Sequence, residues 1–114
     1  MISKKTICEK IKEIAGKPWS PVDIAKVNDQ IVRLALFEGK YHWHKHEHED
    51  EFFLVYSGQI TIQIKDQTEI TLKAGETAVI PKGIEHCPKS IEPSYVLMFE
   101  PQKTNSKGSA NIMP

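Results

Sequence analysis

Residues 59–65 (QITIQIK) alternate between polar and apolar side chains, and this pattern limits the fold more than any other stretch of the chain. Successive side chains of a β-strand point to opposite faces, so Ile60, Ile62 and Ile64 would share one buried face. Other runs of strand length, separated by short polar, Gly- or Pro-containing segments, occur at 31–37, 52–56, 69–72, 77–80, 85–89 and 94–100. Many short strands between regular turns predict an all-β fold, an antiparallel sandwich or barrel.

The amino-terminal part of the chain lacks this rhythm. Ile7, Ile11 and Ile14 recur at helical spacing within residues 4–15, and Gly16 follows, so we expect a short amphipathic α-helix that ends there. Two prolines make residues 17–21 an extended or turning connector. We therefore divide the chain into a helix and connector (1–27), a β-domain (28–101) and a flexible polar tail (102–114).

The charge balance excludes some functions. Fifteen basic residues offset fifteen acidic ones in 114 residues, so no overall field favours nucleic acid or an anionic membrane as a partner. No apolar run has the length of a membrane span, and the charged amino terminus does not resemble a secretory signal. The two cysteines, Cys8 and Cys87, form no disulfide framework. These features predict a cytoplasmic location.

The five histidines are placed very unevenly. Four of them alternate in the segment HWHKHEH, at His42, His44, His46 and His48, and the fifth is His86. An acidic cluster, residues 49–51, follows the four at once. Alternate residues of a strand share a face, so several imidazoles and a carboxylate would converge, and this donor set suits a divalent metal ion.

Two segments resemble the two sequence motifs of the cupin superfamily. The first is His44-x-His46-x4-Glu51-x6-Gly58 and the second is Gly75-x5-Pro81-x-Gly83-x2-His86. The resemblance extends over residues 39–99 and is strongest to small single-domain cupins with WHxHxxxDE and PKGxEH segments. It implies a double-stranded β-helix (jelly-roll) barrel, with a metal ion bound by His44, His46, Glu51 and His86.

Two positions depart from the broader cupin pattern. Gly39 stands one residue closer to His44 than the superfamily consensus has it, and Ser90 replaces an asparagine that often follows the second-motif histidine. Neither change removes a ligand. Both weaken the transfer of a reaction from any particular cupin enzyme.

Strand geometry agrees with this ligand set but leaves other pairs open. His42 with His44, or His46 with His48, would also make an H-x-H pair, although the spacing to Glu51 and Gly58 favours His44 with His46. Unless a bulge intervenes near Gly39, the ligands share strand parity with Val32, Leu34 and Leu36. His42 is then the candidate for proton transfer, because histidine titrates near neutral pH, and His48 is expected at the surface.

The neighbours of the ligands have simpler expected roles. By alternation, Tyr41 and Trp43 face away from the metal and pack against another layer or a second subunit. Phe53 either walls the pocket or fills the core. The remaining neighbours are expected to be buried (Cys87), exposed (Asp50, Glu85) or at the pocket mouth (Glu38, Lys40).

We therefore expect a metal-binding small cupin, either a metal-dependent enzyme of dioxygenase or isomerase type or a non-catalytic module that binds a small ligand. Three imidazoles and one carboxylate leave open positions on a six-coordinate ion. Iron would suit oxygenase chemistry, and manganese, nickel or zinc would suit Lewis-acid chemistry. A small molecule and a second copy of the chain, as a homodimer, are the expected partners.

Overall fold

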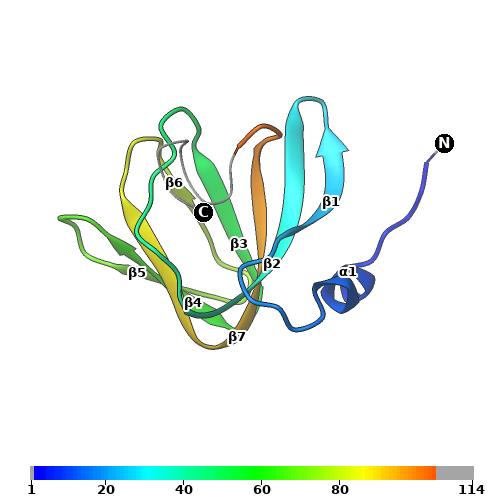
Figure 1. Cartoon of the computed structure of the whole chain (residues 1–114), viewed down its shortest axis with the longest axis horizontal. Helices are drawn as coiled ribbons and strands as arrows, with labels where there is room; N and C mark the ends of the chain where they lie inside the picture. Colours follow the sequence, from blue (N-terminus) through cyan, green and yellow to red (C-terminus); the bar gives the residue numbers. More distant parts are fainter. Residues whose placement is uncertain (1, 105–114) are drawn as a thin grey trace.

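The computed structural model describes residues 2–104 as a jelly-roll barrel with one helix packed outside it (Figure 1). The strands are β1 (Val22–Val27), β2 (Gln30–Lys40), β3 (Glu51–Ser57), β4 (Gln59–Ile64), β5 (Ile70–Lys73), β6 (Thr77–Ile80) and β7 (His86–Pro101). All pairings are antiparallel, in the order β1-β2-β7-β3-β6, with β4 between β5 and the first part of β7. The all-β barrel predicted from the strand rhythm is confirmed.

Helix α1 (Ile7–Ile14) is shorter than predicted at its amino terminus. The Thr6 hydroxyl accepts a hydrogen bond from the Glu9 amide at 3.2 Å, so Thr6 caps the first turn and residues 4–6 stay outside the helix. Ala15 closes the other end in the left-handed conformation. The apolar face of α1 packs against Leu34 and Leu36 on the outside of the barrel.

Strand β1 lies in the segment that the sequence analysis assigned to a connector, and that assignment is wrong for residues 22–27. Val22 pairs with Leu34 and Val27 with Gln30, so β1 forms a hairpin with β2. The turn lies at residues 28–29, where Asn28 has a positive φ of 58°. Val22 and Ile24 pack beside α1. Their alternation with Asp23 and Ala25 was a strand signal, but the nearby prolines obscured it.

The last two predicted strands, 85–89 and 94–100, are one long strand. The first part of β7 pairs with β4, and the second part pairs with β3 and with β2. The register with β2 shifts where residues 91–93 stand opposite Glu38. The outward bulge exposes Ile91 completely and explains why the sequence, with Pro88 and Pro93, reads as two strands.

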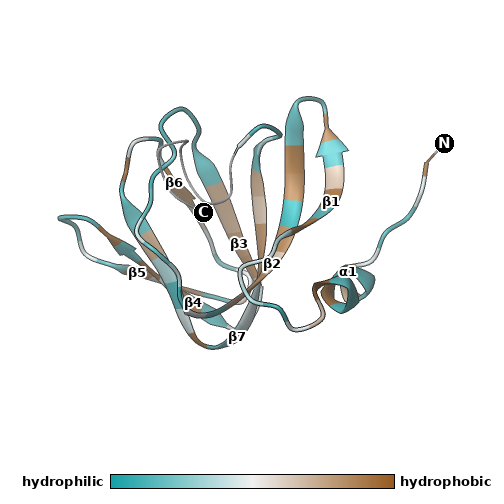
Figure 2. Ribbon diagram, viewed as in Figure 1, coloured by the Kyte–Doolittle hydropathy of each residue, from teal (hydrophilic) through white to brown (hydrophobic). Residues whose placement is uncertain are grey.

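The main core fills the barrel interior. Ile60 and Ile62 are buried there, as their alternation predicted, together with residues of β2, β3 and the second half of β7. Figure 2 shows hydrophobic segments along these strands and polar residues at the turns. Within residues 2–104, no helix has the length and apolar character needed to cross a membrane.

The carboxyl-terminal end of the described chain is fixed by Arg33. The guanidinium of Arg33 donates hydrogen bonds to the carbonyls of Thr104 (3.2 Å) and Gln102 (3.3 Å), and the Gln102 amide donates to Asp29 at 2.8 Å. Residues 102–104, the first part of the tail predicted to be flexible, are thus hydrogen-bonded to the barrel. The rest of the predicted tail, 105–114, lies outside the described residues.

Candidate metal centre

Two backbone features bring the histidine segment to the barrel interior. Gly39 has a φ of +81°, and the β2–β7 register shifts between Phe37 and Gly39. The face of the chain changes at this bulge: Ala35 and Phe37 point into the barrel before it, and His44 and His46 are buried after it. The even-numbered residues before the bulge, Leu34 and Leu36, instead face helix α1, so the parity expected without a bulge does not hold.

The histidines lie on an extended segment, residues 41–50, and not on a regular strand as predicted. Backbone hydrogen bonds fix the position of this segment. The amides of His44 and His86 each donate to the other residue's carbonyl, at 3.0 and 2.9 Å. The Gly83 amide also donates to the His46 carbonyl at 2.8 Å. The two motifs, far apart in sequence, are thus hydrogen-bonded to each other at the site.

The structure brings together the four residues that the sequence predicted as ligands. One donor atom from each of His44, His46, Glu51 and His86 lies within 4.8 Å of the donors of the others, and all four side chains are buried. Nε2 of His46 lies 3.2 Å from Glu51 Oε1, and Nε2 of His86 lies 3.8 Å from the same oxygen. This cluster could hold a metal ion.

Hydrogen bonds orient two of the imidazoles for coordination. Nδ1 of His44 donates to the carbonyl of His42 at 3.0 Å, and Nδ1 of His86 donates to the carbonyl of Ile84 at 2.8 Å. A proton on Nδ1 leaves the lone pair on Nε2, which is the arrangement that a metal-binding imidazole needs. Within residues 2–104, the buried Nε2 atoms of His46 and His86 have no hydrogen-bond partner. The donor set therefore fits a divalent metal ion.

The electrostatics of the cluster favour the deprotonated ligands. Burial lowers the pKa of His44 to about 4, despite the hydrogen bond to the His42 carbonyl, so its imidazole is neutral at pH 7. Burial alone would raise the pKa of Glu51, but the neighbouring imidazoles of His46 and His86, together with Glu100, outweigh it and lower that pKa. Neutral imidazole and carboxylate are the forms that bind metal.

Glu100 and Arg33 form a buried polar pair behind Glu51 that sequence reasoning missed. Arg33 Nη1 donates to Glu100 Oε2 at 2.6 Å, and the Glu100 side chain is fully buried. Burial, together with a hydrogen bond to Glu51, raises the pKa of Glu100 to about 9, against the opposing effect of Arg33. The sequence does contain a signal for this pair: by strand alternation, Glu100 shares the inward face of β7 with the apolar residues Val96 and Met98.

A cavity of about 30 Å³ opens beside His44 and Glu51. Its other walls are mostly apolar: Trp19, Pro21, Ala35, Phe37, Tyr41, Phe53, Pro88 and Met98. Tyr41 is therefore not turned away from the site as predicted, because residues 41–50 do not form a regular strand and their side chains need not alternate between two faces. Its ring stacks on Trp19 at 4.7 Å and meets His44 edge-on at 5.4 Å.

Phe53 both lines this cavity and belongs to the core, so its two predicted roles coincide. Cys87 is buried and His48 is exposed, as predicted, whereas Trp43 is exposed and does not pack against another layer of the described chain. Asp50 is exposed and accepts a hydrogen bond from the Lys82 amide at 2.9 Å, while Glu85 is half-buried, 3.6 Å from Lys65 Nζ. Glu38 and Lys40, expected at the pocket mouth, are exposed and are not among the lining residues.

His42, the predicted proton carrier, is half-buried near the cluster. Its ring lies 4.0 Å from that of Tyr41 and 5.2 Å from that of His44, between ring centroids. The imidazole is not part of the cavity wall, so the contribution of His42 that the structure displays is its backbone carbonyl, which orients His44.

Comparisons with known proteins agree with this architecture. A Bacillus subtilis (strain 168) protein named uncharacterized protein YdbB is 46% identical over 67 residues, which are 59% of this chain and 59% of that protein. The match thus spans about three-fifths of this relative's length. A cupin-2 domain containing protein from Shewanella frigidimarina NCIMB 400 is 40% identical, with a TM-score of 0.80 over 85% of this chain and 93% of that one.

One structure of hydroquinone 1,2-dioxygenase, in complex with Fe3+, shares the fold at 21% identity and a TM-score of 0.69. The match covers 74% of this chain and 28% of that one. The profile of the cupin domain family, Cupin_2, matches residues 31–100, which contain all four clustered residues. The chain belongs to the cupin family.

Proposed function

We propose that this protein is a metal-dependent enzyme that acts on a small molecule, with the metal ion bound by His44, His46, Glu51 and His86. One observation carries the proposal: four buried donor atoms lie within 4.8 Å of one another, and two of the imidazole nitrogens have no partner within residues 2–104. A buried polar atom without a partner is costly, and metal coordination would satisfy it. Iron, manganese, nickel and zinc all accept this donor set.

The chain's own residues would supply orientation and exclusion of water. The carbonyls of His42 and Ile84 fix two imidazoles, and Glu100 supports Glu51 from behind. Mostly apolar side chains line the cavity beside the ligands. A bound divalent ion would supply Lewis-acid or, for iron, redox chemistry at the open positions. The iron-bound dioxygenase of the same fold supports the iron alternative only at the level of the fold.

In this proposal His42 moves protons between the site and solvent. The ring is half-buried and close to His44, but it does not line the cavity, so it would act through water and not by touching the substrate. A His42→Gln variant keeps the backbone carbonyl that orients His44. It should retain its metal ion and lose turnover; loss of the metal, or unchanged turnover, would contradict this role.

The metal site is tested by elemental analysis of protein purified without a histidine tag. We expect about one ion per chain in the wild type and little in His86→Ala and Glu51→Ala. His48→Ala is the matched control, because His48 belongs to the same histidine segment but is exposed. Metal content that is low in the wild type, or that is unchanged in the two ligand variants, would contradict the site.

The alternative is a cupin module that binds a small ligand without turning it over. The narrow apolar cavity beside the cluster is compatible with this function too. Oxygen uptake by the iron form, measured against a panel of thiols, diketones and sugar acids, separates the two. Uptake that depends on one class supports the enzyme, and ligand binding without any turnover supports the module.

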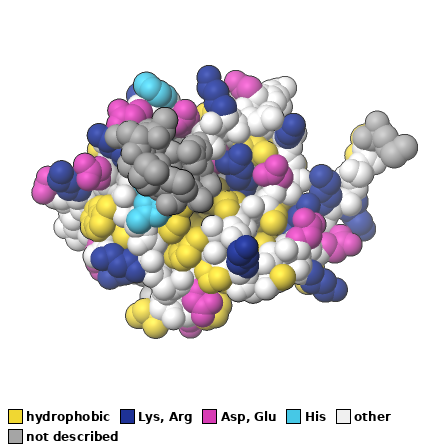
Figure 3. Space-filling view, in the orientation of Figure 1, with side chains coloured by type: hydrophobic (Ala, Val, Ile, Leu, Met, Phe, Trp, Pro, Cys, Tyr) yellow, Lys and Arg dark blue, Asp and Glu magenta, His cyan; other side chains and the backbone are white. Residues whose placement is uncertain are grey.

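We further propose that two copies associate through the outer face of the sheet. Phe99 and Val79 flank Phe52 in the strand order β7-β3-β6, and both are at least one-third exposed. Independently of these three residues, Figure 3 shows hydrophobic side chains gathered in the middle of the face seen in Figure 1. Helix α1 is less available than expected, because its apolar side packs on β2. The dimer would be contradicted if light scattering gave the mass of a monomer at every concentration measured.

A further inference from the structure

The cavity beside the four-residue cluster has walls of a distinctive kind. Apart from His44 and Glu51, the lining consists of aromatic, aliphatic, proline and methionine side chains, and it includes no lysine or arginine within residues 2–104. Most enzyme pockets for carboxylates or phosphates use Arg or Lys to bind the anion. The lining of this cavity provides no such group.

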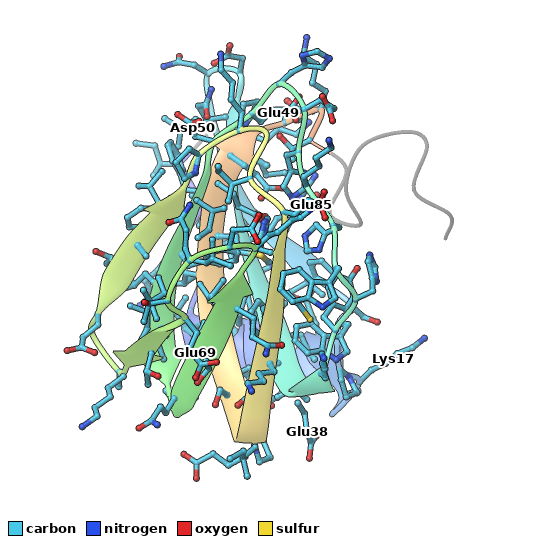
Figure 4. All side chains as sticks on the ribbon, turned by 90° about the vertical axis from the view of Figure 1, so that its left-hand side faces the viewer. Lys17, Glu38, Glu49, Asp50, Glu69 and Glu85 are labelled. Atoms are coloured by element: carbon cyan, nitrogen blue, oxygen red, sulfur yellow. The ribbon has the colours of Figure 1, made fainter. Side chains whose placement is uncertain are left out.

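Several charged side chains lie at the two ends of the barrel, outside the cavity. Figure 4 shows Lys17 and Glu38 together at one end, and Glu49 and Asp50 at the opposite end. Lys17 and Glu38 are exposed, and neither lines the cavity. An anionic group placed inside would lose its water without gaining a cationic side chain, which is costly.

Polar contacts in the cavity are few. The indole Nε1 of Trp19 already donates to the Glu38 carbonyl at 3.0 Å. The Tyr41 hydroxyl is then the main side-chain polar group that the lining offers besides the cluster. A phenol hydroxyl can donate or accept a hydrogen bond. A ligand would thus meet one hydroxyl and otherwise apolar walls.

Trp19 lies on the connector that precedes the barrel strands and forms one wall of the cavity. Its φ of 59° lies in the left-handed region, which costs about 1 kcal/mol for a residue other than glycine. Contacts with β2 offset this cost: the Trp19 amide donates to the Leu36 carbonyl at 2.9 Å, and the ring lies 4.5 Å from that of Phe37. The connector is therefore fixed so that the indole forms part of the cavity wall.

The volume of about 30 Å³ is room for roughly two water molecules, whereas a cavity that binds benzene measures about 150 Å³. A ligand group of two or three non-hydrogen atoms fits this space. An aromatic ring does not fit unless Trp19 or Tyr41 moves.

We propose that this cavity receives the uncharged, apolar end of a small ligand, that it discriminates against ligands ending in a carboxylate or phosphate, and that Trp19 is the residue that sets the size limit. The inference rests on the proposed metal site, because the other end of the ligand would coordinate the ion. It goes further than that proposal by naming the substrate class and a specificity-determining residue on the connector.

The test uses three thiols that share the HS–CH2–CH2 unit and differ only at the far end. They are 3-methylbutane-1-thiol (neutral isopropyl end), 3-mercaptopropionate (carboxylate end of similar shape) and 2-phenylethanethiol (phenyl end). Each is titrated into cobalt(II)-loaded protein, and the thiolate-to-cobalt absorption band gives the dissociation constant. We expect the isopropyl probe to bind the wild type at least about tenfold more tightly than either of the others, which corresponds to about 1.4 kcal/mol.

Trp19→Ala should then bind the phenyl probe at least about tenfold more tightly than the wild type, a further 1.4 kcal/mol, with its preference against the carboxylate retained. Trp43→Ala is the matched control, because Trp43 is exposed and its removal should leave all three affinities unchanged. Trp19→Phe, a smaller change to the wall, provides the size test if the alanine variant fails to fold.

The outcomes separate this inference from the proposed function. No cobalt bound to the wild type would contradict the metal site itself. Cobalt bound with equal or tighter binding of 3-mercaptopropionate would overturn the substrate class while leaving the metal site intact. Unchanged affinity for 2-phenylethanethiol in the folded Trp19 variants would overturn the role of Trp19.

Discussion

Arg33 on β2 donates a buried hydrogen bond to the carboxyl group of Glu100 on β7, with 2.6 Å between Nη1 and Oε2. The pair connects three parts of the molecule: Glu100 interacts electrostatically with Glu51 of the metal cluster, and Arg33 also donates hydrogen bonds to the carbonyls of residues 102 and 104. The site at the barrel interior and the end of the described chain therefore depend on the same two side chains.

Removal of one member of this pair should destabilise the fold strongly. Glu100→Ala leaves the Arg33 guanidinium without its buried hydrogen-bond acceptor, and an unsatisfied buried charged group costs about 3 kcal/mol. Asp23→Ala is the matched control, since Asp23 also pairs with Arg33, at 3.3 Å, but its side chain is 65% exposed. The control should lose less than about 1 kcal/mol. Urea denaturation of the metal-free proteins measures both, and equal losses would contradict the assignment.

Glu100 should also make the stability of the metal-free protein fall as the pH rises. Its folded-state pKa of about 9 lies above the value of about 4.3 in an unfolded chain. Between these values the unfolded chain has released a proton that the folded chain retains, so the stabilising contribution is complete below about pH 4.3 and is lost as the pH approaches 9. Glu100→Gln carries no titrating proton there, and its unfolding free energy should fall less between pH 6 and pH 9. Parallel curves for the two proteins would contradict the shift.

His44 should make the free energy of unfolding of the metal-free protein fall as the pH decreases. Its folded-state pKa of about 4 lies below the unfolded value of about 6.5, so its contribution is present above pH 6.5 and is lost as the pH falls toward 4. The full loss is on the order of 3 kcal/mol. His44→Gln cannot be protonated and should lose less stability than the wild type between pH 6.5 and 4.5. Chemical denaturation at the two pH values, without metal, measures the difference.

Gly58 should tolerate no side chain. A Cβ at this position would overlap the Ser94 hydroxyl oxygen and lie 2.9 Å from the Ser94 Cα, in addition to the strain of a φ of +89°. Gly75 has a similar φ of +86° and open space around it, so Gly75→Ala reports the strain alone, about 1 kcal/mol. We expect Gly58→Ala to cost at least about 2 kcal/mol more than that control in thermal or urea unfolding. A Gly58→Ala variant as stable as Gly75→Ala would show that Ser94 moves freely.

The sequence by itself determined the class of fold and the four clustered residues. Alternation over residues 59–65 needs only the period of a strand, and Ile60 and Ile62 are buried as it predicts. The resemblance of two segments to the cupin motifs implied His44, His46, Glu51 and His86, and these four side chains do lie together. Strand alternation is a local property, and the motifs are recognisable in sequence even though the fold is what brings them together.

Contacts between segments distant in sequence decided the rest. The bulge at Gly39, fixed by pairing with β7, reversed the face of the chain, and the irregular segment after it allows both Tyr41 and His44 to line the cavity. Pairing with β2 made residues 22–27 a strand, and barrel closure buried Glu100 beside Arg33 and Glu51. Neither the face that a bulge selects nor the partner of a buried charge follows from the spacing of residues, because both depend on which strands lie side by side.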